Sequence, residues 1–360
     1  MRNNITYYEI KEILESGYPL PKNLIDYLLS NDVLKKLMRN ILPGYCESDI
    51  HFEPSYKRNP ITGTIQLEKK KFLKLHGRLP GYADRIIYNI KYKSPEYKVR
   101  DELYDLLKVT GNDHYPVIYM CRVLSFSIGI VTWNIGSGNP KSINQELLIK
   151  YFEDFGEYTD VFIIGFQESS IYTKPNLEIL KSIYKSSISI RDSNIKSFVG
   201  HLIGFGLETC ILWNNVFCNL SEYKEYSSNE TITKGAHFFK FVLKNCRHKL
   251  SLAFSNIHAP FTEDSLKYNN FIRKINDKLE DFGSSDIKFI FGDLNSRTKL
   301  SLYYDTPIIL KKNIFLNKKF NLFKKNFKKQ ISYIEMGYLL KKLNTYKKID
   351  FSKKSLLIKN

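Results

Sequence analysis

Cysteine is scarce in this sequence, and its few copies are not arranged in pairs. The chain of 360 residues has five scattered cysteines with no Cys-x-x-Cys spacing: Cys46, Cys121, Cys210, Cys218 and Cys246. An odd, dispersed set excludes a small fold built on disulfides and speaks against a zinc site. We therefore expect the cysteines to be reduced packing residues of an intracellular protein.

Long hydrophobic runs are also absent. No apolar stretch approaches the ~18 residues that a membrane-spanning helix needs, and the first residues, MRNNITYYEI, lack the apolar core of a signal peptide. The last residues, SLLIKN, form no prenylation box. These absences predict a cytoplasmic protein whose contact with membranes is at most peripheral.

Acidic residues are in deficit, most of all near the end of the chain. The formal net charge is +18, and residues 301–360 contain 15 Lys and no Arg against three carboxylates, which is two thirds of the excess. This segment is either a solvated basic tail or a patch for an anionic membrane or nucleic acid. Near an anionic leaflet each Lys would contribute ~1 kcal/mol to binding.

The remaining composition predicts a globular α/β protein. Hydrophobic residues make up 43% and aromatic residues 14% of the chain, which excludes a disordered protein. Residues 6–40 have helical spacing, and strands then alternate with helices, which is typical of layered α/β folds. The predicted strands are 85–92, 126–133, 161–166, 201–213, 216–220, 236–243, 250–257 and 287–292, and the predicted helices that follow residue 40 are 142–154 and 264–280.

Two apolar runs near the middle of the chain organise the prediction. Pro116–Val123 and Phe126–Trp133 are rich in β-branched and aromatic residues, which predicts two buried strands. The joint between them has two residues, which predicts a hairpin. The pair would present Asp113 and His114 before its first strand and Asn134 after its second, at one edge of a sheet.

The sharpest motif is FIFGDLNSR, residues 289–297. An apolar strand ends there in Gly-Asp-x-Asn, so that Asp293 and Asn295 point the same way. A carboxylate beside an amide suits the activation of one water, although a turn with an Asx cap would look the same. A second apolar strand ends in Glu168, which could hold Mg²⁺, and a third strand leads to His258.

These strand ends together resemble the endonuclease/exonuclease/phosphatase superfamily, although the chain after residue 297 contains no His. The missing boxes stand at the front instead. Residues 75–92, 111–117 (GNDHYPV) and 44–63 resemble the Asp-Arg, Ser-Asp-His and Pro-Thr-Tyr-Lys boxes of the inositol polyphosphate 5-phosphatases. Two departures are Asn112, where the family has Ser, and Ser296, where it has Tyr.

The order of these boxes resembles a circularly permuted family member. Residues 2–123 would be equivalent to the family's C-terminal half and residues 124–297 to its N-terminal half, in a single domain over 1–300 followed by a Lys-rich tail at 301–360. The resemblance implies a four-layered α/β sandwich (DNase-like), circularly permuted, with a basic C-terminal tail. Complementation of half-domains between two chains is the alternative, and the short joint favours pairing within one chain.

The resemblance also implies catalytic roles. Asp293 would be the base for the attacking water, with Asn295 orienting it. Asp84 would hydrogen-bond His114 and fix its tautomer, so that His114 and His258 face the phosphoryl oxygens.

The implied cofactor is Mg²⁺, held by Glu168 with Asn134 and Asp113 close to it.

The implied substrate is multiply phosphorylated. Tyr56, Lys57, Lys71 and Arg78 resemble the segment that grips the phosphate next to the scissile one, and Lys234 resembles a Lys-Gly motif on the 1-phosphate side. Clustered cations suit such a ring.

These residues predict a Mg²⁺-dependent phosphatase acting on the 5-phosphate of phosphoinositides or inositol polyphosphates, with the tail favouring an anionic membrane. One alternative is a nuclease of the same superfamily, for which the net charge would suit nucleic acid. Nucleic acid is the less favoured partner because of the Tyr56-Lys57 box. The other alternative is a phosphoinositide-binding module without catalysis.

Overall fold

The chain divides into two units, residues 1–300 and 301–360, in a computed structural model. The structure describes residues 13, 20–66, 80–91, 97–136, 144–156, 158–169, 184, 186–190, 206–229, 234–260 and 265–296. The predicted basic tail lies outside the described residues, as do Lys71 and Arg78 and residues 6–12 and 14–19 of the predicted helical stretch 6–40.

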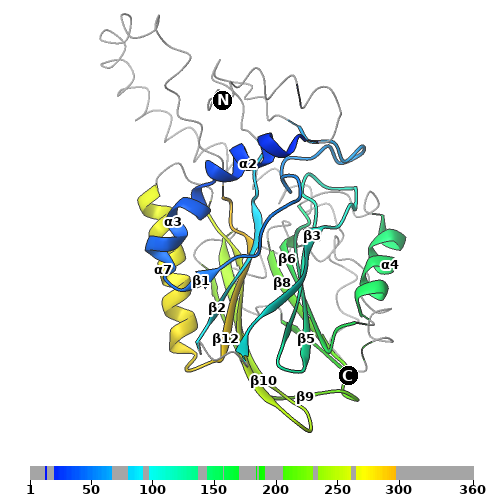
Figure 1. Cartoon of the computed structure of the whole chain (residues 1–360), viewed down its shortest axis with the longest axis vertical. Helices are drawn as coiled ribbons and strands as arrows, with labels where there is room; N and C mark the ends of the chain where they lie inside the picture. The colour runs from blue at the N-terminus through cyan, green and yellow to red at the C-terminus, as the bar shows by residue number, and fades with distance from the viewer. Residues whose placement is uncertain are drawn as a thin grey trace, which may run out of the picture. The chain divides into compact units, whose positions relative to one another are not determined.

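Two six-stranded mixed sheets form the centre of the first unit (Figure 1). In spatial order, the first sheet contains β1 (Tyr45–Cys46), β2 (Asp84–Ile90), β12 (Ile287–Asp293), β11 (Lys249–His258), β10 (Gly235–Lys244) and β9 (Asn219–Asn229). The second contains β3 (Arg100–Leu106), β4 (Val117–Val123), β5 (Phe126–Asn134), β6 (Val161–Ser169), β8 (Gly206–Trp213) and β7 (Ser186–Ile190). The described helices of eight residues or more are α2 (Lys22–Ser30), α3 (Val33–Ile41), α4 (Gln145–Gly156) and α7 (Ser265–Asp281).

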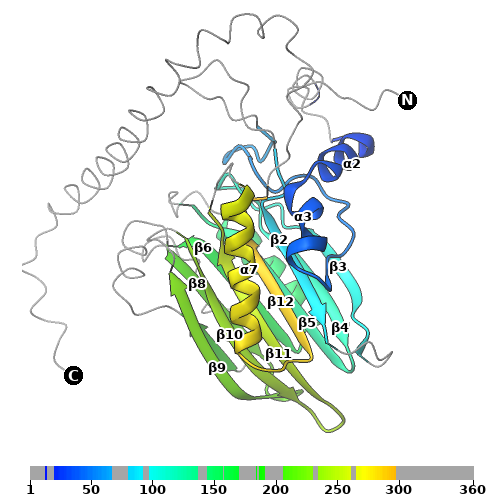
Figure 2. The same ribbon diagram turned by 90° about the vertical axis from the view of Figure 1, so that its left-hand side faces the viewer.

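The two sheets pack face to face, and helices cover their outer faces. Aromatic rings fill the space between the sheets, such as Phe254 and Phe289, whose centroids lie 5.0 Å apart in a stack. Outside, α3 and α7 pack on the first sheet and α4 on the second (Figures 1 and 2). This arrangement of helix, sheet, sheet and helix confirms the predicted α/β sandwich. Because both faces of the central strands are buried, their sequences are continuous apolar runs rather than alternating ones.

Two glycines permit the close approaches that this packing needs. A Cβ at Gly165 on β6 would lie 2.4 Å from a ring carbon of Phe291 on the opposite sheet. A Cβ at Gly292 would lie 2.0 Å from the carbonyl oxygen of Ile257, and Gly292 has a φ of +138°, which favours glycine. The backbone conformation at the Gly-Asp-x-Asn motif, where β12 ends, therefore depends on the glycine itself.

The start of α3 is tied to the end of β12. Asp32 is the N-cap of this helix, since its Oδ1 accepts a hydrogen bond from Lys35 N at 2.9 Å. Asp32 Oδ2 accepts a hydrogen bond from Ser296 Oγ at 2.6 Å, and Ser296 Oγ accepts one from Leu34 N at 3.0 Å. The loop after the Gly-Asp-x-Asn motif is thereby anchored on a helix terminus.

The sequence missed strands at the edges of the sheets. β3 and β7 are edge strands, and β9, also at an edge, continues to Asn229, beyond the predicted end at 220. Edge strands pair on one side only and tolerate charge, so β3 (RDELYDL) lacks the apolar signal of a buried strand.

The expectation that all cysteines pack in the core was wrong, because Cys46 and Cys246 are exposed while the other three are buried. None of the helices described here has the length and apolarity to cross a membrane.

Candidate active site

Strand register gathers three predicted side chains at one edge of the first sheet. In the parallel pair β11–β12, His258 lies opposite Asp293. In the antiparallel pair β12–β2, Asp293 lies opposite Asp84. Residues directly opposite one another on neighbouring strands point to the same face. The three groups therefore converge although they lie far apart in the sequence.

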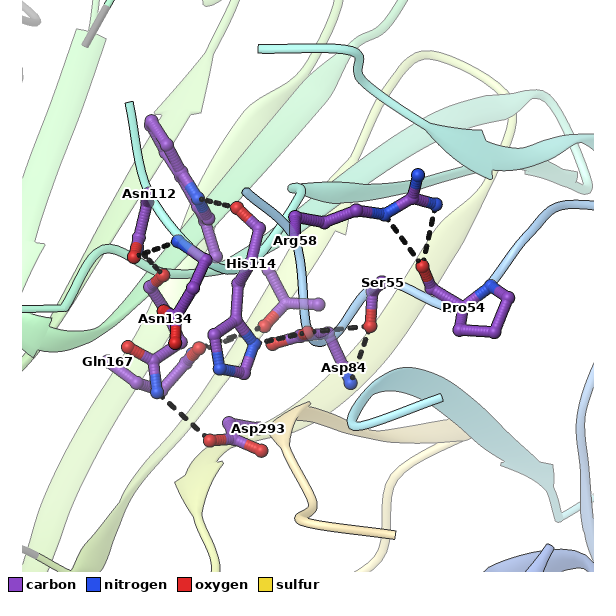
Figure 3. A network of polar contacts seen from close by, with 12 residues as sticks. Pro54, Ser55, Arg58, Asp84, Asn112, His114, Asn134, Gln167 and Asp293 are labelled. Carbon is purple, nitrogen blue, oxygen red and sulfur yellow. Dashed lines mark hydrogen bonds and ion pairs between the residues drawn. The ribbon is translucent and has the colours of Figure 1, made fainter. Parts of the chain in front are cut away.

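The second sheet contributes an amide and a carboxylate across the gap, and Figure 3 labels the amide residue, Asn134, near Asp293. Asn134 ends β5, and Glu168 lies near the end of the neighbouring parallel strand β6. Asn134 Nδ2 donates to Asp293 Oδ2 at 3.0 Å and to Glu168 Oε1 at 3.3 Å. One amide thus joins carboxylates from the two sheets, and the polar cluster spans both.

Asp293 is a buried carboxylate held in its ionised form. Asn295 N donates to its Oδ1 at 2.9 Å, and His258 Nε2 lies 3.4 Å from its Oδ2. Burial alone would raise the pKa of Asp293, but hydrogen bonding to His258 and the charges of His114, His258 and Lys234 lower it below its usual value. The carboxylate can therefore accept a hydrogen bond from a water at any physiological pH.

His114 and Asp84 form a buried pair that keeps a proton at neutral pH. His114 Nδ1 lies 2.8 Å from Asp84 Oδ2, and Ser55 Oγ donates to the same oxygen at 2.7 Å. Burial lowers the pKa of His114, but Asp84 outweighs it and the pKa rises to about 9. The pKa of Asp84 is raised, chiefly by burial. With Nδ1 engaged, Nε2 is the nitrogen of this ring that can serve a ligand.

His258 stands between the other charged groups. Its Nε2 lies 3.6 Å from Glu168 Oε1 and is in close contact with Lys234 Nζ. Among the described residues, His258 Nδ1 and Asp84 Oδ1 are buried without a hydrogen-bond partner. Buried polar atoms are almost always satisfied, so these two atoms mark a place where a ligand or water belongs.

The donor set fits a hard divalent cation such as Mg²⁺. The Glu168 side chain is 24% exposed, whereas those of Asp293 and Asp84 are 3% and 0% exposed. No group of three or more His, Cys, Asp or Glu side chains arranged to hold a metal occurs within the described ranges. Mg²⁺ commonly binds through one or two carboxylates and completes its shell with water and substrate phosphate, which Glu168 and the Asn134 amide suit.

Asp113, predicted beside the metal, lies next to a lysine. Its Oδ2 is 3.8 Å from Lys57 Nζ, and both side chains are about one third exposed. The ring of Tyr56 lies against that of His114, with centroids 4.5 Å apart. The structure therefore brings Tyr56, Lys57 and Lys234 to the rim of the same cluster.

The sequence did not single out several groups that support these side chains. Ser55 lies inside the quoted Pro-Ser-Tyr-Lys box and holds Asp84. Trp133 Nε1 donates to the carbonyl of His114 at 3.1 Å, and Gln167 Nε2 donates to Asn256 Oδ1 at 2.7 Å, beneath the site. Asn112, noted only as a departure, hydrogen-bonds the carbonyl of Asn134. The sequence signal that could have identified these supporting residues is their position within or next to the motifs.

Part of the sequence matches known proteins. A family model described as Endonuclease/Exonuclease/phosphatase family 2 matches residues 1–120. Phosphatidylinositol polyphosphate 5-phosphatase type IV from Homo sapiens is 35% identical over 98 residues, which is 27% of this chain and 14% of that relative; the Pan troglodytes protein gives the same figures. The chain thus spans a small part of the curated relatives it matches.

Solved structures also match part of the chain. A humanised D. rerio TDP2 is 19% identical with a TM-score of 0.33, covering 47% of this chain and 62% of that one. The inositol polyphosphate 5-phosphatase domain of a synaptojanin is 16% identical with a TM-score of 0.27, covering 47% and 54%. The predicted resemblance to the endonuclease/exonuclease/phosphatase superfamily is confirmed, and residues 1–120 carry the match to its family 2.

Proposed function

We propose that the protein is a Mg²⁺-dependent phosphatase that removes the 5-phosphate from phosphoinositides or soluble inositol polyphosphates. The observation that supports this most is the contact of Asn134 with both Asp293 and Glu168. It brings a water-activating carboxylate and a metal-binding carboxylate within one hydrogen-bonded unit. Protonated His114 and the His258 side chain flank this unit as partners for a phosphoryl group.

In this proposal Glu168 and Asn134 would hold Mg²⁺, which when bound neutralises charge on the scissile phosphate. Asp293 accepts a proton or hydrogen bond from the attacking water. Asn295 holds Asp293 in place, since its Nδ2 donates to Asp293 Oδ2 at 3.3 Å and to the carbonyl of Ala259 at 2.8 Å. A rigid base within reach of the water is the first requirement of general base catalysis.

The histidines would stabilise the phosphoryl oxygens. His114 carries its proton at neutral pH because Asp84 raises its pKa to about 9. The contact of Lys234 with His258 adds a second positive centre. Fixed donors in a buried site favour the transition state because they need no reorganisation as charge develops.

The proposed substrate class rests on the cationic side chains at the rim of the polar cluster. Lys57, about one third exposed, lies over the ring of Tyr56 at 5.9 Å from its centroid and can meet a second phosphate. Lys71 and Arg78 are proposed to add further cations, and the Lys-rich tail to favour an anionic membrane. The 35% identical human relative is a phosphatidylinositol polyphosphate 5-phosphatase by name, which supports the same substrate class.

We further propose that the domain is circularly permuted. The family match ends at residue 120, before the strands β5, β6, β11 and β12 that carry Asn134, Glu168, His258 and Asp293. The hairpin β4–β5, with Leu124-Ser125 as its turn, would then be the point where the family's natural ends are fused.

Cutting this turn is expected to leave a working protein, because a family member has its two ends there. A protease site inserted between Leu124 and Ser125 should, after cleavage, give two fragments that co-elute and keep at least about half of the activity, since loop cuts with close ends are tolerated. The control is the same insertion, uncleaved. Fragments that separate or unfold on cleavage would contradict the permutation.

The function itself is tested by measuring free phosphate released from phosphatidylinositol 4,5-bisphosphate and from inositol trisphosphate. Release is expected with Mg²⁺, is expected to fall to background in chelator, and is expected to return when Mg²⁺ is restored. Nicking of plasmid DNA without phosphate release would favour the nuclease. Lipid binding without turnover by the folded protein would favour the binding module.

A further inference from the structure

A cavity lies at the end of the first sheet opposite to the candidate active site. It has a volume of about 340 Å³ and is lined by Lys91 and Asn89 at the end of β2, Glu280 on α7, the loop 283–285, and Lys288 on β12. β2 runs from Asp84, in the active site, to Ile90, beside the cavity. Six steps of about 3.3 Å separate the two places by roughly 20 Å, so this is a distinct site.

The cavity contains a largely buried cation. The side chain of Lys288 is only 11% exposed, and its ammonium contacts Glu280, whose side chain is 56% exposed. Lys91 also lines the cavity, and Lys240 Nζ donates to the carbonyl of Ser284 at 2.7 Å in the adjoining loop. The charged side chains named at this end of the sheet are therefore three ammonium groups and two carboxylates, that of Glu280 and that of the nearby Asp286, whose Oδ2 accepts a hydrogen bond from Ser251 N at 2.7 Å.

A buried hydroxyl in the lining independently indicates a ligand. Ser285 is 2% exposed, lines the cavity, and its Oγ has no hydrogen-bond partner within the described part of the chain. An unsatisfied buried hydroxyl costs about 1–3 kcal/mol, which a bound acceptor would recover.

The loop itself leaves room for such an acceptor. Gly283 has a φ of +89°, and a Cβ built on it would meet only Lys240 Nζ, at 3.8 Å.

We propose that this cavity binds a phosphate group. A phosphate offers several equivalent oxygens that can accept from Lys288 Nζ, Lys91 Nζ and Ser285 Oγ together, which a single carboxylate such as Glu280 does less well. The volume exceeds that of the ion and lies in the range of small-ligand sites, which suits a phosphate monoester. The source is a soluble phosphate or an anionic lipid headgroup. The described residues that line the cavity include no histidine or cysteine, and the proposal is for binding alone.

The test is the rate at which each lysine of the full chain is acetylated, read by mass spectrometry. Millimolar inorganic phosphate, compared with chloride at equal ionic strength, is expected to slow labelling of Lys91 by about tenfold once phosphate is at ten times its Kd. Lys278, on α7 but outside the lining and 39% exposed, is the internal control and should keep its rate.

Two variants and a second ligand complete the experiment. Ser285→Ala and Lys288→Met should each abolish the protection of Lys91, whereas Lys278→Met should leave it intact. Vesicles of phosphatidylcholine with a phosphoinositide replace phosphate in a parallel arm. Protection by either ligand supports the site and identifies its source. Protection by neither, or protection that persists in Ser285→Ala and Lys288→Met, overturns it.

Discussion

Asp293→Asn is expected to lower metal-dependent phosphate release by about 10³-fold, with little change in substrate binding. The substitution keeps the shape of the side chain but removes the negative charge that His258, His114 and Lys234 hold in place. An amide cannot take a proton from the attacking water, so the loss should appear in kcat rather than in KM. Phosphate release at saturating substrate, with Mg²⁺ present, measures it.

The matched control is Asp160→Asn at the opposite end of the second sheet. The Asp160 carboxylate accepts a hydrogen bond from Ser127 N at 2.8 Å and takes no part in the site. This variant should keep its kcat within about twofold, because a side chain that does not contact the reacting groups does not stabilise the transition state. An Asp293→Asn enzyme that stays folded and works at a rate close to that of the control would refute the role of Asp293.

Arg85→Met is expected to lower the free energy of unfolding by about 3–5 kcal/mol, because it leaves two buried carboxylates without their cation. Arg85 is fully buried and pairs with Asp32 at 2.9 Å and with Glu47. Tyr104 OH, from the second sheet, donates to Glu47 Oε1 at 2.9 Å, so the ion pairs also link the two sheets. Denaturation by urea, followed by circular dichroism, measures the loss.

Arg122→Met provides the comparison for this change. Arg122 pairs with Glu102 at 3.2 Å but its side chain is 52% exposed, and an exposed pair contributes at most about 1 kcal/mol. Adding Glu47→Gln to Arg85→Met should recover part of the stability, because it removes one of the stranded charges. Equal losses for Arg85→Met and Arg122→Met would show that the buried network contributes no more than a surface pair.

The central strands and the polar strand ends were predictable because both signals are local. Runs such as VFIIGF and FIF are typical of buried strands covered on both faces. A polar residue just beyond such a run lies where the strand ends. The Gly-Asp-x-Asn motif gave Asp293 in this way, whereas Asp84, at the start of β2, was predicted from the resemblance to the Asp-Arg box of the 5-phosphatases.

What the sequence could not supply depends on distances across the fold. Edge strands such as β3 carry charge and have no apolar period. The bond from Gln167 to Asn256 exists only because Gly165 lets the sheets approach one another. The contact of Asp113 with Lys57 follows from the path of a loop, which no motif spacing encodes. The permuted order and the roles of Lys71 and Arg78 stay predictions.

The link between Asp32 and Ser296 has a consequence for how this sequence can change over generations. Asp32 receives hydrogen bonds from Lys35 N, Arg85 and Ser296 at once, so both of its carboxylate oxygens are engaged. The tyrosine that the 5-phosphatases carry at the position of Ser296 would fill the space where Leu34 N and Asp32 meet the smaller hydroxyl. Positions 32 and 296, 264 residues apart, should therefore vary together among descendants of this chain, each substitution at one selecting its counterpart at the other.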